Sequence, residues 1–135
     1  MGNLFEAFGT DKDLEQNGVW FEVTPGVRFL CRRMGQMNKK FKKEFGNRMK
    51  AHQRQYQQGT LDPELADSIT KDTFIHSVLM DWEGVTDREG KELDFNFNNA
   101  RWLFDELPDV YSAIFEESGK AGNYLVKEAE EAGNG

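Results

Sequence analysis

The side chains that could support catalysis are two histidines and one cysteine. His52 and His76 fall at or beside apolar positions of two predicted helices, where a histidine hydrogen-bonded within the core is more common than a catalytic base. Cys31 lies on the apolar side of a predicted strand, so an inert buried thiol is expected. The sequence contains no nucleophile elbow, no Cys–His pair with an orienting acid and no phosphate-binding glycine loop. It therefore predicts no enzyme, no catalytic residue and no cofactor.

A run of acidic residues around a predicted turn raises the question of calcium. Its members are Asp81, Glu83, Asp87, Glu89, Glu92 and Asp94. An EF-hand loop needs a side-chain ligand at its first position and glycine at its sixth. Counting back from Gly84 and Gly90 places Leu79 and Val85 at that first position, and neither can bind a metal through its side chain. We interpret the run as a solvated acidic turn, and no metal site is expected.

The strongest functional signal is a basic segment at residues 28–54. It holds ten Lys and Arg and a single acid, Glu44, although the whole chain of 135 residues has a net charge of −7. A solvated helix face would normally intersperse acids for i,i+4 pairing. The face therefore repels itself unless phosphates of nucleic acid, an acidic partner or carboxylates of this chain or of another copy neutralise it. The site predicted for partner binding or self-association consists of Lys39, Lys40, Lys42, Lys43, Arg48 and Lys50.

Composition limits the remaining alternatives. The length suits one domain, and eleven Phe and three Trp indicate a substantial core. A single cysteine fits a reducing cytosol, and no apolar run is long enough to span a membrane. The N-terminus shows no signal-peptide pattern. Nucleic acid is disfavoured as a partner because the chain is acidic and the aromatic residues of the basic segment fall on the predicted core side.

The pattern of the chain predicts a mainly α-helical fold, a single-domain helical bundle with a short N-terminal β-hairpin. Period-two alternation predicts the two hairpin strands, and Thr24-Pro25-Gly26 predicts their turn. The expected organisation is an N-terminal arm at 1–16, the hairpin at 17–34, a helical body at 35–129 and a frayed tail at 130–135.

Sequence patterns predict the helices of the helical body at residues 35–129. Asn38 is expected to cap a helix whose stripe Phe41, Phe45, Met49, His52 and Tyr56 faces the core. Asp62-Pro63 opens a second helix, predicted to be central because it is apolar nearly all round as far as Trp82. A short extended piece is expected near residues 93–97, then helices capped by Asn98 or Asn96, interrupted at Pro108 and ended at Gly119. A last short helix holds Tyr124, Leu125 and Val126.

Four residues are assigned structural roles. Trp82 is expected to anchor the core and Gly84 to stop the central helix. Trp20 belongs to the hairpin, and Pro108 breaks the helix that follows Asn98.

The order of these features resembles the small tail assembly chaperones of long-tailed bacteriophages. The likeness is carried mainly by residues 81–85 (Asp-Trp-Glu-Gly-Val), by the Asn-Ala helix at 98–104 and by the Leu-Pro-Asp break at 107–109. The hairpin start at 17–21 and the basic helix beginning at 38–41 precede them in the expected order. The resemblance covers residues 17 to 126.

The resemblance implies a non-enzymatic protein of the host cytoplasm that is absent from the finished particle. Such chaperones are thought to coat the tape measure protein and keep it from aggregating until the tail tube polymerises around it. Many of these families also make a longer product by ribosomal frameshifting. The implied partner is the tape measure protein, with a second copy of this chain and the tail tube protein as further partners. The alternatives are a structural tail or connector protein of the virion and a small nucleic-acid-binding regulator.

Overall fold

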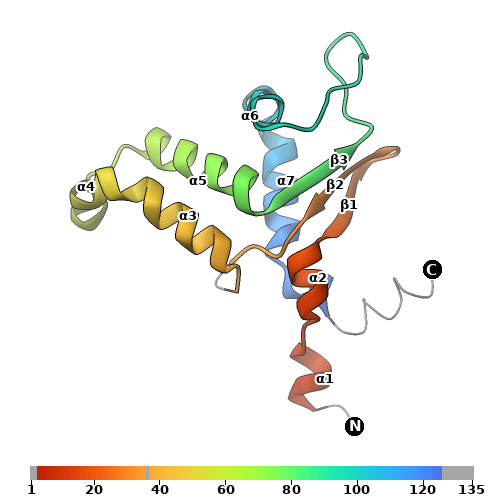
Figure 1. The fold of residues 1–135 in the computed structure, drawn as a ribbon, viewed down its shortest axis with the longest axis horizontal. Helices are drawn as coiled ribbons and strands as arrows, with labels where there is room; N and C mark the ends of the chain where they lie inside the picture. Colours follow the sequence, from red (N-terminus) through yellow and green to blue (C-terminus); the bar gives the residue numbers. More distant parts are fainter. Residues whose placement is uncertain (1–2, 36, 126–135) are drawn as a thin grey trace.

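The computed structural model describes residues 3–35 and 37–125 (Figure 1). A three-stranded antiparallel sheet has the order β1-β2-β3, and its strands are β1 Val19–Thr24, β2 Val27–Cys31 and β3 Leu79–Glu83. The α-helices are α1 Leu4–Phe8, α2 Lys12–Asn17, α3 Lys39–Met49, α4 Gln53–Gln58, α5 Pro63–Ser77, α6 Phe97–Glu106 and α7 Pro108–Ser118. Two 3-10 helices, η1 Lys50–His52 and η2 Ala121–Tyr124, complete the elements.

The prediction of a mainly α-helical bundle is wrong, because the fold is mixed α/β. The predicted central helix ends at Ser77, and the residues that follow form β3, which pairs with β2 through Phe29 and Trp82. A short run of apolar residues has no periodicity that separates a buried helix from a buried strand. Residues 79–83 become a strand because they pair with β2. This pairing gives the second edge of β2 hydrogen-bond partners, since β1 already occupies the first.

The predicted β-hairpin is confirmed. Val19 pairs with Cys31 and Phe21 with Phe29, and the turn at Pro25-Gly26 uses a positive φ of 85° at the glycine. A register shift between Glu22 and Thr24 interrupts the pairing near the turn. An isolated two-stranded hairpin is only marginally stable in water. Here β3 pairs with one edge of the β-hairpin, and α7 packs against both of its strands.

The core lies between the sheet and helices α5, α6 and α7. Its buried side chains are Phe29, Cys31, Phe74, Ile75, Val78, Leu79, Trp82, Val85, Ala100, Leu103, Phe104, Tyr111 and Ile114. Trp82, which was predicted to anchor the core, is buried in it. Its ring meets Phe29 and Phe95 edge to face, and its indole N–H donates to the carbonyl of Leu93 at 2.9 Å. The loop between β3 and α6 is thereby fastened to the core.

The basic segment forms a helical hairpin with α5, which we call the α3–α5 hairpin (residues 38–77). Figure 1 shows α3 and α5 side by side, with α4 at the far end. The predicted caps are confirmed: the Asn38 side chain accepts from the Phe41 N–H, and the Asp62 side chain accepts from the Glu64 N–H. The predicted aromatic stripe is only partly right. Phe41 packs against the core and Met49 is buried, but Tyr56 is 58% exposed.

The C-terminal part follows the predicted breaks. Asn96 caps α6, and Pro108 stands at the first turn of α7, which ends at Gly119. The extended piece expected near residues 93–97 is not a strand. Beside it, Thr86 and Glu92 form an isolated bridge, and the Leu93 N–H donates to the Val85 carbonyl at 3.0 Å.

The predicted last helix shrinks to the 3-10 turn η2. In it the Tyr124 hydroxyl donates to the Cys31 carbonyl at 3.0 Å. Val126 and the tail predicted at 130–135 lie outside the described residues. Among the helices that the structure describes, none has the length and apolarity needed to cross a membrane.

Candidate functional site

The arginines of the basic segment are mostly engaged within the molecule. Arg28 forms an ion pair with Glu83 at 2.7 Å and lies over the Trp20 ring, Arg33 pairs with Glu15 at 3.2 Å, and Arg48 pairs with Glu44 at 2.6 Å. The hydrogen bond from Arg48 lowers the pKa of Glu44. Of the six residues predicted as a partner site, Arg48 is therefore already neutralised.

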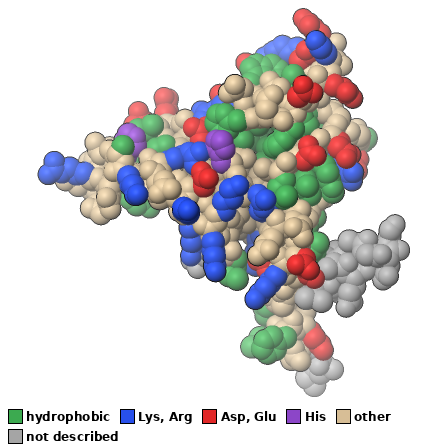
Figure 2. Space-filling view, viewed as in Figure 1, with side chains coloured by type: hydrophobic (Ala, Val, Ile, Leu, Met, Phe, Trp, Pro, Cys, Tyr) green, Lys and Arg blue, Asp and Glu red, His purple; other side chains and the backbone are tan. Residues whose placement is uncertain are grey.

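The other five residues of that site are free. Lys39, Lys40, Lys42, Lys43 and Lys50 are exposed and form no ion pair with any carboxylate in the described part of the chain. We call these five lysines the basic face. The structure brings them together along α3 and its continuation η1, and Figure 2 shows Lys and Arg gathered along this edge of the α3–α5 hairpin.

The concentration of positive charge on the basic face destabilises α3. Lys39 and Lys40 occupy the first turn, where the helix dipole disfavours positive charge, and no acid offsets them there. Lys39 and Lys43 repel each other at i,i+4 spacing, which costs about 0.2–0.5 kcal/mol per pair. Packing of Phe41 and Met49 holds the helix in place despite these terms. A bound acidic group would relieve the repulsion.

A cleft that the sequence did not reveal opens beside the basic face. It has a volume of about 600 Å³ and forms where α3, η1 and α4 meet, and we call it the elbow cleft. Its lining is Lys42, Lys43, Phe45, Gly46, Asn47, Met49, Lys50, Gln53, Tyr56 and Gln57. Tyr56 was expected in the core, and its exposure is the feature that creates one wall. The i,i+4 pattern of the aromatic stripe contained these residues but could not show that the helix would change direction.

A second cleft lies at the opposite end of α3. It has a volume of about 390 Å³, and its lining includes Lys12, Arg32, Arg33, Lys39 and Lys40 with one carboxylate, that of Glu15. Glu15 is already paired with Arg33. The basic face therefore extends past α3 to Lys12 of α2 and Arg32 after β2, two cations that were not part of the predicted site.

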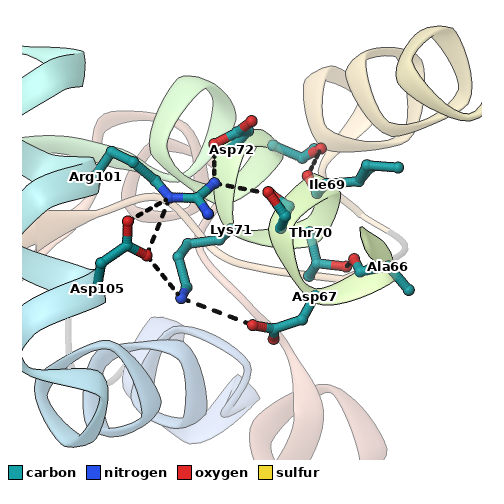
Figure 3. A network of polar contacts seen from close by, with 10 residues as sticks. Ala66, Asp67, Ile69, Thr70, Lys71, Asp72, Arg101 and Asp105 are labelled. Carbon is teal, nitrogen blue, oxygen red and sulfur yellow. Dashed lines mark hydrogen bonds and ion pairs between the residues drawn. The ribbon is translucent and has the colours of Figure 1, made fainter. Parts of the chain in front are cut away.

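In contrast to the lysines of α3, the charged side chains where α5 meets α6 are paired with one another (Figure 3). Arg101 of α6 binds Asp72 of α5 at 2.5 Å and Asp105 at 3.1 Å. Lys71, only 8% exposed, pairs with Asp105 at 3.2 Å and with Asp67 at 3.7 Å. This network joins α5 to α6 and fixes the direction in which the hairpin presents its lysines.

The candidates for catalysis and metal binding do not assemble into a site. His76 is exposed and stacks on Phe97 with ring centroids 4.5 Å apart, so the expectation that it lies within the core is wrong. Cys31 is fully buried, and burial raises its pKa to about 12. The Asp87 side chain caps the acidic turn by accepting from the N–H groups of Glu89 and Lys91. Within residues 3–35 and 37–125, no three His, Cys, Asp or Glu side chains are grouped to hold a metal ion.

The remaining predicted structural residues have roles that the structure specifies. Trp20 is half-buried beneath the Arg28 guanidinium, 4.2 Å from the ring centroid. Pro108 separates α6 from α7. Gly84 does not stop a helix as predicted. It follows β3 with a φ of 77°, pressed against the β1–β2 turn.

Comparison with known proteins identifies a family for the C-terminal three quarters of the chain. Searches of curated proteins and of solved structures found no match. The YdaY prophage protein family matches residues 36–134, a region that begins just before α3 and includes the α3–α5 hairpin, β3, α6 and α7. This chain therefore belongs to the YdaY prophage protein family.

Proposed function

We propose that this protein is a phage tail assembly chaperone that binds the tape measure protein through its basic face during tail tube assembly. The observation that carries the proposal is the set of five lysines on α3 and η1 without ion pairs among the described residues. Membership of a prophage protein family supports a role in the phage life cycle. The host cytoplasm, where tails are assembled, is the compartment that goes with this proposal.

The physical requirements of such a chaperone match the geometry of the α3–α5 hairpin. A long amphipathic partner exposes apolar side chains that aggregate in water, so its chaperone needs apolar surface as well as charge. The elbow cleft supplies apolar surface next to Lys42, Lys43 and Lys50. Complementary charge speeds the encounter of two proteins and leaves the complex reversible, which suits a chaperone that must leave before the tube closes.

A charge-reversal experiment tests the proposal. The protein is co-expressed with the tape measure protein of the same prophage, and co-purification is compared for the wild type and for the triple variant Lys40→Glu, Lys42→Glu, Lys43→Glu. The control is Arg88→Glu, Lys91→Glu, Lys120→Glu, which changes net charge equally at exposed positions outside the α3–α5 hairpin. It also removes the surface ion pairs of Arg88 with Glu106 and of Lys120 with Glu117, which contribute little to stability. We expect the first variant to lose the partner and the control to retain it.

Circular dichroism of both variants establishes that each remains folded. Glutamate in the first turns of α3 also suits the helix dipole, so the test variant should not unfold. Co-purification that survives reversal of the basic face would refute the proposal. Recovery of the protein in purified particles would instead identify a structural component of the virion.

A further inference from the structure

The elbow cleft combines an apolar floor with a charged rim. Three apolar side chains line it, Phe45 and Met49 from α3 and Tyr56 from α4. Lys42, Lys43 and Lys50 also line it. None of these lysines has a carboxylate partner within the described ranges. An exposed apolar surface with a polar rim is typical of a protein interaction site.

Gly46 keeps this cleft open. Along α3 the positions 39, 43, 46 and 50 follow one another at spacings of four and three, so they share one face of the helical run. Lysines occupy three of these positions and Gly46 occupies the fourth. A Cβ built at Gly46 meets no atom within 4 Å. The missing side chain therefore leaves free space between Lys43 and Lys50.

Tyr56 is the second unusual feature of the cleft. Its ring is 58% exposed at the far end of the α3–α5 hairpin, although it continues the apolar stripe of α3. The stacked pair Phe41 and Phe45, with ring centroids 5.8 Å apart, leads from the core toward this exposed ring. Phe45 and Tyr56 both line the elbow cleft, so apolar side chains extend from the core to an exposed aromatic ring.

We propose that the elbow cleft binds an apolar side chain of an acidic amphipathic helix in the partner protein, with lysines of the rim pairing with carboxylates that flank this anchor. The inference deepens the proposed function and rests on it for the identity of the partner. The volume of about 600 Å³ accommodates an aromatic or long aliphatic side chain. The uncompensated positive rim selects an acidic helix over a basic one.

The occupant predicted in this way has a recognisable pattern. One apolar residue enters between Lys43 and Lys50, above Gly46, and acids lie one helical turn on either side of it. Further acids of the same helix face Lys39 and Lys40, which line the second cleft at the start of α3. Because α3 has 11 residues, about 16 Å of helix separates its two ends, so a partner helix of about three turns spans them.

The test uses synthetic peptides and two substitutions of one glycine. The probe is a fluorescein-labelled amphipathic helix with leucines on one face and glutamates on the other, and its counterpart has lysine at every glutamate position. Binding is measured by fluorescence anisotropy. Gly46→Leu fills the cleft, and Gly46→Ala adds a single methyl group in open space and is the matched control.

We expect wild-type protein to bind the acidic peptide and to ignore the basic one. Gly46→Leu should weaken binding by about tenfold or more, whereas Gly46→Ala should change it by less than about twofold. Tyr56→Ser, which removes one wall without touching the lysines, should weaken binding like Gly46→Leu. Equal affinity of wild type, Gly46→Leu and Tyr56→Ser for the acidic peptide would overturn the inference.

Co-expression of the same variants with the tape measure protein separates this inference from the proposed function. If Gly46→Leu co-purifies with that protein as well as wild type does, the elbow cleft is not the docking site, although the chaperone function stands. If wild type binds the acidic peptide in the cleft but does not bind the tape measure protein, the proposed chaperone function is wrong. The inference that the cleft binds an acidic amphipathic helix then stands. Self-association abolished by Gly46→Leu would make a second copy the occupant and overturn the assigned partner.

Discussion

The backbone of Gly84, just after β3, lies directly against the carbonyl oxygen of Gly26 in the β1–β2 turn, so that a Cβ at position 84 would overlap that oxygen. Gly84 also has a φ of 77°, which side-chain-bearing residues rarely adopt. The missing side chain of Gly84 thus allows the end of β3 to pass beside the β1–β2 turn. This contact positions the third strand on the sheet.

Gly84→Ala should therefore destabilise the protein by about 3 kcal/mol, because backbone strain and steric overlap act together. Gly90→Ala is the control, since Gly90 has a similar φ of 86° but open space at its Cβ. That change should cost about 1–2 kcal/mol. Urea denaturation of both variants measures the difference. Equal losses would mean that the close approach to Gly26 contributes nothing.

Trp82→Ala should lower the free energy of unfolding by about 3–5 kcal/mol. The substitution removes a buried ring from between Phe29 and Phe95 and also the hydrogen bond that fastens the loop at Leu93. Thermal or urea unfolding measures this loss of free energy of unfolding. Hydrogen exchange at residues 84–96 should rise at the same time. A loss below about 1 kcal/mol would show that β3 is peripheral to the core.

Cys31 should resist alkylation while the protein is folded. Burial raises the pKa of its thiol from 9.0 to about 12, so at pH 8 the thiolate is about a thousandfold rarer than in an unfolded chain. Reaction with iodoacetamide should become fast only when denaturant unfolds the protein. The exposed residue Ser112 offers a control, because Ser112→Cys in a Cys31→Ala background should react at once. Rapid labelling of native Cys31 would contradict its burial.

Asp105→Asn should reduce the acid sensitivity of the fold. Burial tends to raise the pKa of Asp105, but hydrogen bonds from Arg101 and Lys71 outweigh burial and lower it. The stability that this carboxylate contributes is therefore complete above its ordinary pKa of 3.8 and is lost as pH falls through the lower pKa of the folded state.

The difference between wild type and Asp105→Asn should accordingly be largest at neutral pH and shrink as the pH falls through the lowered pKa of Asp105 in the folded state. Because the Asp105 side chain is half exposed, we expect it to stay below about 1 kcal/mol. Urea denaturation at several pH values measures it. Glu116→Gln, at an exposed position without an ion pair among the described residues, should show no comparable trend. A difference independent of pH would assign the effect to packing.

Much of the fold could be predicted from local patterns. The hairpin turn at Pro25-Gly26, the caps at Asn38 and Asp62 and the break at Pro108 depend on side chains that act on backbone within a few residues. The strand β3 could not be predicted in this way. Its apolar residues fit a buried helix equally well, and only pairing with β2, about fifty residues earlier, makes them a strand.

The candidate site could likewise be predicted only in part. The cluster of lysines at residues 39–50 is evident in the sequence, and its exposure on one side of α3 follows from helical periodicity. Which cations are free could not be read from the sequence, because Arg28 and Arg33 find their acids on other elements, at Glu83 and Glu15. The exposure of Tyr56 and the cleft beside it were also missed.

The β-hairpin, the helix caps and the lysine-rich face follow from the amino-acid sequence, because each depends on interactions between near neighbours or on the period of a single helix. Only the folded structure shows that residues 79–83 form a strand, that Arg28 and Arg33 pair with carboxylates of other elements while five lysines form no ion pair among the described residues, and that α3 and α4 meet at an open cleft. Strand pairing and these two ion pairs join residues far apart in the chain, whose distances are set only by folding. The cleft is lined by residues 42–57, and its shape depends on how α4 is oriented relative to α3, which helical periodicity does not specify.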